Sequence, residues 1–206
     1  NEEKFLDYGR KSIIYVNEDE VEKWWNDLKE RVVKNKKVYI RGYGNNGQHT
    51  KIFLDFIQYA FGNTNIKVDS SRNRYAQTCI KKYTGLARNI DIQNYQVSHI
   101  FEMTKNPFMF ECPWNLAYIP KIFDPFTGHE SNGEWSKKFK KIYLNDVKNK
   151  FQKYIDEYNE LMEKYKINKK IEKFIEEKLN KYNNKQLIRL KKDLIKNFNL
   201  INKEEV

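Results

Sequence analysis

The chain has 206 residues, 39% of them hydrophobic and 15% aromatic, which excludes an intrinsically disordered protein and predicts a sizeable core. A formal net charge of +11 favours a polyanionic partner, nucleic acid before an anionic membrane, although an AT-rich genome also produces a lysine-rich chain. Two cysteines without a CxxC or Cys/His pattern argue against a structural zinc site and against a disulfide-stapled secreted domain.

The same features indicate where the protein works. Apolar runs stay well short of the roughly 18–20 residues that a membrane span needs, and the start of the chain, NEEKFLDYGRK, is too charged for a signal peptide. We therefore expect no membrane partner and a cytoplasmic location, with Cys79 and Cys112 both reduced.

The N-terminal part alternates between helical and strand patterns. Apolar residues at three- and four-residue steps predict helices, and short runs rich in β-branched and aromatic residues predict strands. In chain order, the expected elements are a helix over 19–33, a strand over 37–40, a helix over 49–61, a strand over 65–68 and a short helix over 75–83. Residues 1–93 are thus predicted to form a mixed α/β part.

A glycine-rich turn, Gly42 to Gly47, joins an expected strand to an expected helix. Its G-x-G-x-x-G spacing, with Asp69 about twenty residues on, matches the dinucleotide-binding fingerprint. Such a domain needs several more βαβ units, which the rest of the sequence does not predict. A tight turn is the favoured interpretation, and backbone amides that approach a DNA phosphate are another.

An alternating strand pattern then leads to His99, one of three histidines in the chain. Asn115 follows His99 by sixteen residues, and Asp124 follows Asn115 by nine. Gly128 comes four residues after Asp124. A histidine on an apolar strand is most often a packing residue, so only this downstream spacing makes His99 a candidate for chemistry.

The C-terminal part predicts helices throughout. Residues 134–206 contain neither Pro nor Gly, and apolar residues recur at helical steps over 139–162, with shorter helices expected over 171–179 and 186–198. From residue 130 onward there are roughly 20 Lys and Arg against about 13 Asp and Glu. This region is expected to be a solvated helical face that covers the rest of the protein, a surface that binds the DNA backbone, or a helical arm that forms a dimer.

The stretch 94–130 resembles the HNH, or ββα-metal, nuclease superfamily. In that pattern a His ends a strand, a hairpin arm of about fifteen residues leads to an Asn-Leu-x-x-Ile-Pro-like segment, and a metal ligand follows about nine positions after the Asn. The residues that carry the resemblance are His99, Asn115, Leu116, Ile119, Pro120, Asp124 and Gly128. The resemblance implies an α+β fold with a small ββα-metal core over 94–133, between the mixed part over 1–93 and a basic helical region over 134–206.

The resemblance also implies a role for each site residue. His99 would be the general base, since neutral imidazole suits that task near pH 7. Asp124 would bind one divalent cation, Mg²⁺ with Mn²⁺ as the alternative, because hard cations prefer oxygen ligands. Asn115 would either brace the hairpin loop or ligate the metal. Ser98 stands where many members carry a second, acidic ligand, and Glu102 or His129 are candidates to replace it.

A small basic protein with one such core looks like a type II restriction endonuclease or a related defence nuclease. That likeness implies site-specific cleavage of DNA by a homodimer, because a palindromic site presents the same half-site twice. The candidate DNA-binding residues are Arg72, Asn73, Arg74, Lys105 and Lys121, although a plain surface loop also explains residues 70–74. The alternatives are a non-catalytic basic nucleic-acid-binding module and a dinucleotide-binding protein built on Gly42–Gly47.

Overall fold

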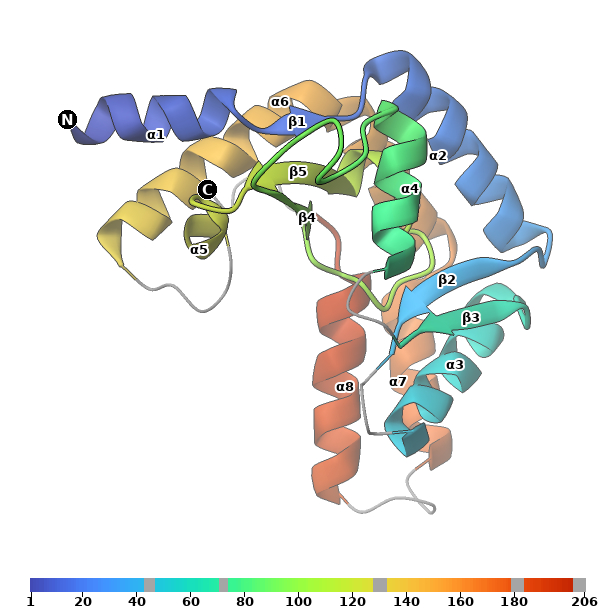
Figure 1. Ribbon diagram of the computed structural model, residues 1–206. Helices are drawn as coiled ribbons and strands as arrows, with labels where there is room; N and C mark the ends of the chain where they lie inside the picture. Colours follow the sequence, from blue (N-terminus) through green and yellow to red (C-terminus); the bar gives the residue numbers. More distant parts are fainter. Residues whose placement is uncertain (43–46, 71–73, 128–132, 179–183, 202–206) are drawn as a thin grey trace.

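Two small sheets carry the β-structure of this computed structural model (Figure 1). It describes residues 1–42, 47–70, 74–127, 133–178 and 184–201. One sheet has three strands in the order β1–β5–β4, and the other pairs β2 with β3. The strands are β1 (Ile14–Tyr15), β2 (Val38–Arg41), β3 (Ile66–Asp69), β4 (Tyr95–His99) and β5 (Leu116–Pro120).

Helices make up most of the remaining structure, and the expected α+β class is confirmed. The helices are α1 (Glu2–Lys11), α2 (Glu18–Val33), α3 (Gly47–Phe61), α4 (Arg74–Thr84), a 3₁₀ turn η1 (Pro113–Asn115), α5 (Asp124–Thr127), α6 (Glu134–Lys164), α7 (Ile167–Lys178) and α8 (Asn184–Phe198). Every helix that the periodicity predicts is present. The helix α1 and the two-residue strand β1 were not predicted, because neither carries a long enough apolar repeat.

The strands β2 and β3 form a parallel pair joined through α3. Val38 lies opposite Ile66 and Arg41 lies opposite Asp69. Parallel strands need a crossover of this kind, and the helix supplies it. Gly42 directly follows β2, where a Cβ atom would lie 2.6 Å from Cγ1 of Val68, so close packing of the two strand ends explains this glycine.

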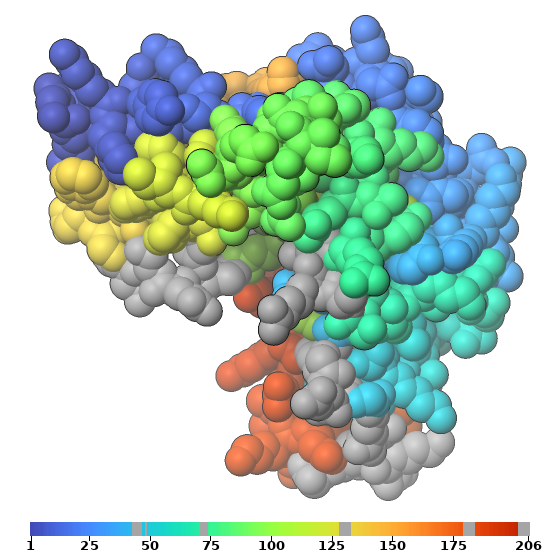
Figure 2. Space-filling view, viewed as in Figure 1, coloured from blue at the N-terminus to red at the C-terminus, as the bar shows by residue number. Residues whose placement is uncertain are grey.

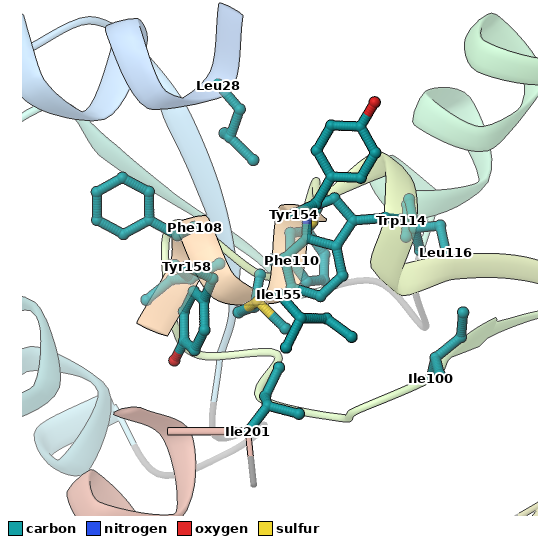
Figure 3. Packing of buried hydrophobic residues seen from close by; sticks show 14 of the residues in the cluster. Leu28, Ile100, Phe108, Phe110, Trp114, Leu116, Tyr154, Ile155, Tyr158 and Ile201 are labelled. Carbon is teal, nitrogen blue, oxygen red and sulfur yellow. The ribbon is translucent and has the colours of Figure 1, made fainter. Parts of the chain in front are cut away.

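The core is centred on an irregular segment between β4 and β5, not on a sheet. Phe108, Phe110 and Trp114 of this segment are fully buried and gather with Ile155 and Tyr158 of α6 (Figure 3). These three aromatic residues and Phe123 each have 0% of their surface exposed.

The C-terminal helices pack on the N-terminal part. Helices α7 and α8 lie beside α3 (Figure 1). The ring centroid of Phe174 on α7 lies 5.3 Å from that of Phe56, and Phe198 at the end of α8 lies 5.8 Å from Phe53. Helix α6 bends at Phe151, whose φ of −118° and ψ of 20° are non-helical. The apolar faces of the basic helices therefore join one continuous core with the rest of the chain.

Cys79 and Cys112 are both buried as free thiols. In the described parts of the chain, every helix is either too short or too polar to cross a bilayer.

Gly9 tests the packing of α1 on the rest of the protein. A Cβ atom at this position would lie 2.3 Å from Cε1 of the buried Phe123 ring. We expect Gly9→Ala to destabilise the protein by about 1–3 kcal/mol through overpacking, which outweighs the gain in helix propensity of about 1 kcal/mol. Urea unfolding measures the change. Gly47→Ala is the control, since no described atom lies within 4 Å of the equivalent Cβ, and equal stability of the two variants would contradict the packing.

Candidate active site

His99 is the last residue of β4, at the point where the strand leaves its sheet. Strand β4 pairs antiparallel with β5, and His99 lies opposite Leu116. Helix α5 follows β5 after a short turn and begins at Asp124. The chain order is therefore strand, loop, strand and helix. His99 is the last residue of the first strand, and Asp124 is the first residue of the helix.

The His99 ring is held in one tautomer by the backbone. Its Nε2 atom lies 3.0 Å from the carbonyl oxygen of Phe110, and the two rings stack with centroids 5.3 Å apart. Because a carbonyl oxygen only accepts hydrogen bonds, Nε2 carries the hydrogen and Nδ1 keeps its lone pair. Burial lowers the pKa of His99 to about 4, against an opposing effect of the Phe110 carbonyl. The ring is therefore neutral at pH 7 and can accept a proton at Nδ1.

Asn115 braces the loop that holds His99. Its side chain is fully buried. The Oδ1 atom accepts a hydrogen bond from the Phe101 N–H at 2.7 Å, and Nδ2 donates to the Met109 carbonyl at 2.9 Å. A longer contact of 3.4 Å joins Nδ2 to the Glu102 carbonyl. Both ends of the amide are used within the loop, so the geometry favours bracing over metal ligation.

A buried ion pair holds the same loop from the other side. Glu111 has 1% of its surface exposed, and it accepts hydrogen bonds from the guanidinium of Arg31 at 2.8 Å and from the Tyr39 N–H at 2.5 Å. Burial raises the pKa of Glu111, while Arg31 and the Tyr39 N–H oppose that shift. The hydroxyl of Tyr83 donates to the Glu111 carbonyl at 2.9 Å. These contacts fix the backbone next to the Phe110 carbonyl that orients His99.

His99 and Asp124 line one polar cavity of about 510 Å³. Ser98 lines it too, and cations reach it from β2 and from the loop, at Arg41 and Lys105. Burial lowers the pKa of Lys105. The tertiary structure thus brings together the expected base, the expected metal ligand and one of the expected DNA-binding lysines.

The acidic residues of the cavity set limits on metal binding. Besides Asp124, the cavity is lined by Glu102 and Asp193, but Glu102 pairs with Lys196 at 3.2 Å and Asp193 pairs with His49 at 3.1 Å. No cluster of three or more His, Cys, Asp or Glu residues that could hold a metal occurs in the described ranges. The donors fit a Mg²⁺ ion held by one carboxylate with water and substrate oxygens, which is how this ion commonly binds.

The remaining expected site residues fall into two groups. His129, Arg72 and Asn73 lie outside the described residues, so their expected roles remain predictions. Arg74, the first residue of α4, and Lys121, just after β5, are exposed and do not line this cavity. Any contact that these two make with DNA would therefore lie beyond the cavity.

The end of β2, just before the glycine-rich turn, lies at the same cavity. The Arg41 N–H donates to the Thr104 carbonyl at 2.8 Å, so the end of β2 is joined to the loop after His99. Of this turn the structure describes Gly42 and Gly47, and residues 43–46 lie outside the described ranges. In the described chain the parallel sheet has only two strands, whereas a dinucleotide site forms at the switch point of a larger sheet.

Sequence reasoning missed several residues that build the site. Arg41, Asp193 and Lys196 come from distant elements, and no local pattern marks them. Glu111 offered a signal, because it is a charged residue within the apolar run from Phe108 to Trp114. Such a residue predicts a buried ion pair, although not its partner.

Comparisons with known proteins assign the chain to a family. A family model described as "Uncharacterised protein PM1201" matches residues 16–203. The protein "Uncharacterized protein PM1201" of Pasteurella multocida (strain Pm70) is 42% identical over 177 residues, which is 84% of this chain and 80% of that protein. The chain belongs to the PM1201 family. No solved structure matches it.

The match to the PM1201 family covers the candidate active site in full. It runs from just after β1 to beyond α8, and it includes His99, Asn115 and Asp124. In this PM1201-family chain, a neutral imidazole in a fixed tautomer shares a polar cavity with a carboxylate and several cations. Chemically, such a site can accept a proton while it holds an anionic substrate.

Replacing Asn115 tests whether the loop depends on its amide. We expect Asn115→Ala to cost about 2–4 kcal/mol, because it leaves the Phe101 N–H and the Met109 carbonyl buried without partners. Asn145→Ala, at an exposed position on α6, is the control and should change stability by less than about 0.5 kcal/mol. Chemical denaturation compares the two, and equal costs would show that the loop does not need the brace.

The low pKa of His99 predicts a pH dependence of stability. The folded protein holds His99 neutral down to about pH 4, whereas the unfolded chain takes up a proton near pH 6.5. The unfolding free energy should therefore fall as pH drops below 6.5, by about 2 kcal/mol between pH 7 and pH 5 for this group. His99→Gln should lack this component. Urea titrations of both proteins over that pH range measure it, and parallel curves would contradict the low pKa.

Proposed function

We propose that this protein is a metal-dependent DNA endonuclease of the HNH type that hydrolyses phosphodiester bonds. One observation carries the proposal: His99, at the end of β4, and Asp124, at the start of α5, line the same polar cavity. The order of strand, loop, strand and helix around them supports the resemblance of residues 94–130 to that superfamily.

His99 would act as the general base. Its Nδ1 atom would take a proton from water as the water oxygen bonds to phosphorus and the bond to the leaving sugar oxygen breaks. The Phe110 carbonyl would keep Nε2 protonated throughout and so hold the ring in the required tautomer. A folded-state pKa of about 4 keeps the imidazole neutral at pH 7, at the cost of a weaker base.

Asp124 would hold one divalent metal ion, Mg²⁺ or Mn²⁺. Such an ion, when bound, would neutralise charge on the phosphoryl and leaving oxygens. His129 remains a proposed further ligand. Lys105 and Arg41 line the same cavity and would bind the phosphates on either side of the reacting one.

The proposed substrate rests on the net charge of the chain, and the proposed cellular location rests on its two cysteines. The net charge of +11 favours DNA, and a type II restriction enzyme would act as a homodimer on a palindromic site. Arg72, Asn73, Arg74 and Lys121 are the proposed contacts outside the cavity. Two buried free thiols suit a reducing compartment, so we propose that the protein works in the cytoplasm.

Cleavage of supercoiled plasmid tests the proposal. The wild-type protein should nick DNA with Mg²⁺ or Mn²⁺, and EDTA should abolish the reaction. His99→Ala and Asp124→Asn should each lower the rate by about 100-fold or more, since each removes a group that acts on the reacting phosphate. Asp19→Asn, at an exposed position on α2, is the matched control and should keep full activity. The pH–rate profile should fall only as the pH approaches 4.

Other outcomes would separate the alternatives. A folded protein that binds DNA but cleaves neither DNA nor RNA with either metal would be a nucleic-acid-binding module in which His99 is structural. Stabilisation by NAD(H) in a thermal shift would support a dinucleotide site at Gly42–Gly47 instead. Sequencing the ends of the digested plasmid distinguishes a restriction enzyme, with discrete ends at one motif, from a non-specific nuclease with scattered ends.

A further inference from the structure

A second cavity, of about 600 Å³, lies beside the cavity of His99. Its sides come from α6, α8 and the start of the loop after β4. In Figure 2 the outline of the molecule is indented where α8, in red, meets the larger upper part. The floor is apolar and is formed by Ile100, Phe101, Met103, Leu144, Ile195 and Ile201. We call this cavity the lysine groove because four lysines line it.

Four lysines and one acidic residue line the lysine groove. Lys140 and Lys148 stand two helical turns apart on α6 and face Lys192 and Lys196 on α8. The acidic residue is Glu102, which is paired with Lys196. Leu144 lies between the two α6 lysines on the same helix face, so the cationic and apolar surfaces are interleaved. The groove therefore suits a ligand that is both anionic and apolar.

The lysine groove and the His99 cavity adjoin at residues 102 and 103, which we call the ridge. Glu102, Met103 and Lys196 line both cavities. Glu102 has a φ of 62° and Met103 a φ of 41°, so two consecutive residues other than glycine adopt the left-handed conformation. Such backbone costs about 1–3 kcal/mol per residue, and it persists only where the surroundings fix it. The Glu102 N–H bonds the His99 carbonyl at 3.2 Å, which ties the ridge to the strand that carries the base.

We infer that the lysine groove binds nucleotides of a nucleic-acid strand, with bases on the apolar floor and backbone phosphates on the lysines. A nucleotide carries an apolar face beside an anion, and a strand can continue across the ridge into the His99 cavity. The Glu102–Lys196 pair is partly exposed and so costs little to exchange for a phosphate. The inference rests on the proposed function, since it takes the strand to be the substrate of His99.

Binding of a fluorescein-labelled oligonucleotide in EDTA tests the charges of the groove without cleavage. We expect the double variant Lys140→Glu, Lys192→Glu to weaken binding at least tenfold and to lower the salt dependence by about two ion equivalents. The control is Lys141→Glu, Lys191→Glu, which makes the same change of charge on the same two helices at exposed positions that do not line the groove. It should change affinity less than threefold. Circular dichroism checks that all variants fold.

An oligonucleotide that lacks bases tests the apolar floor. Ile195 has 37% of its surface exposed, so Ile195→Ser is a mild change. We expect this variant to bind the normal oligonucleotide several-fold more weakly than wild type and the abasic oligonucleotide equally well. Single-stranded and duplex probes are compared in the same assay to tell which form the groove takes.

The outcomes separate this inference from the nuclease proposal. Equal losses in the two double variants, no effect of Ile195→Ser, or binding of phosphatidylglycerol vesicles but of no oligonucleotide would each overturn the groove. Groove-dependent binding without cleavage in any metal would leave the groove standing and overturn the nuclease. If the groove variants cleave and bind DNA as well as wild type does, the nuclease proposal would stand and the groove would be overturned.

Discussion

The structure depends on keeping an irregular segment, residues 100–115, in the middle of a hydrophobic core. Residues 106–115 of this segment are buried, so their backbone donors and acceptors need partners within the protein. Asn106, Glu111 and Asn115 supply or anchor many of these partners, and each is at most 1% exposed. The side chain of Asn106 bonds Tyr158 of α6 and the Asn197 carbonyl of α8, both at 3.0 Å. Helices and strands from across the chain thus meet on this one segment.

The same constraint fixes the ring of His99 in one orientation. The segment offers a fixed carbonyl, that of Phe110, and this oxygen decides which ring nitrogen carries the hydrogen. Burial that stabilises the core also lowers the pKa of the imidazole, so packing and reactivity are linked. Arg31 and Glu111 act on His99 only through the backbone between them, as positioning residues.

The His99 cavity and the lysine groove adjoin each other but differ in their lining. The polar cavity holds the groups that can move a proton or hold a cation, whereas the neighbouring groove offers apolar surface between lysines. The left-handed ridge at Glu102 and Met103 divides them. Under the proposed function, a nucleic-acid strand that occupied both cavities would cross this ridge.

The sequence by itself determined most of the helices, the order of β2, α3 and β3 along the chain and the spacing of His99, Asn115 and Asp124, because these depend on local periodicity and on turns. Only the tertiary structure decided which residues surround His99, Asn115 and Asp124. The pairing of Arg31 with Glu111, the brace at Asn115 and the four lysines around one groove join residues far apart in the chain. Such contacts follow from how the amphipathic faces pack on each other. The hydrophobic pattern of the sequence does not specify which of these faces meet.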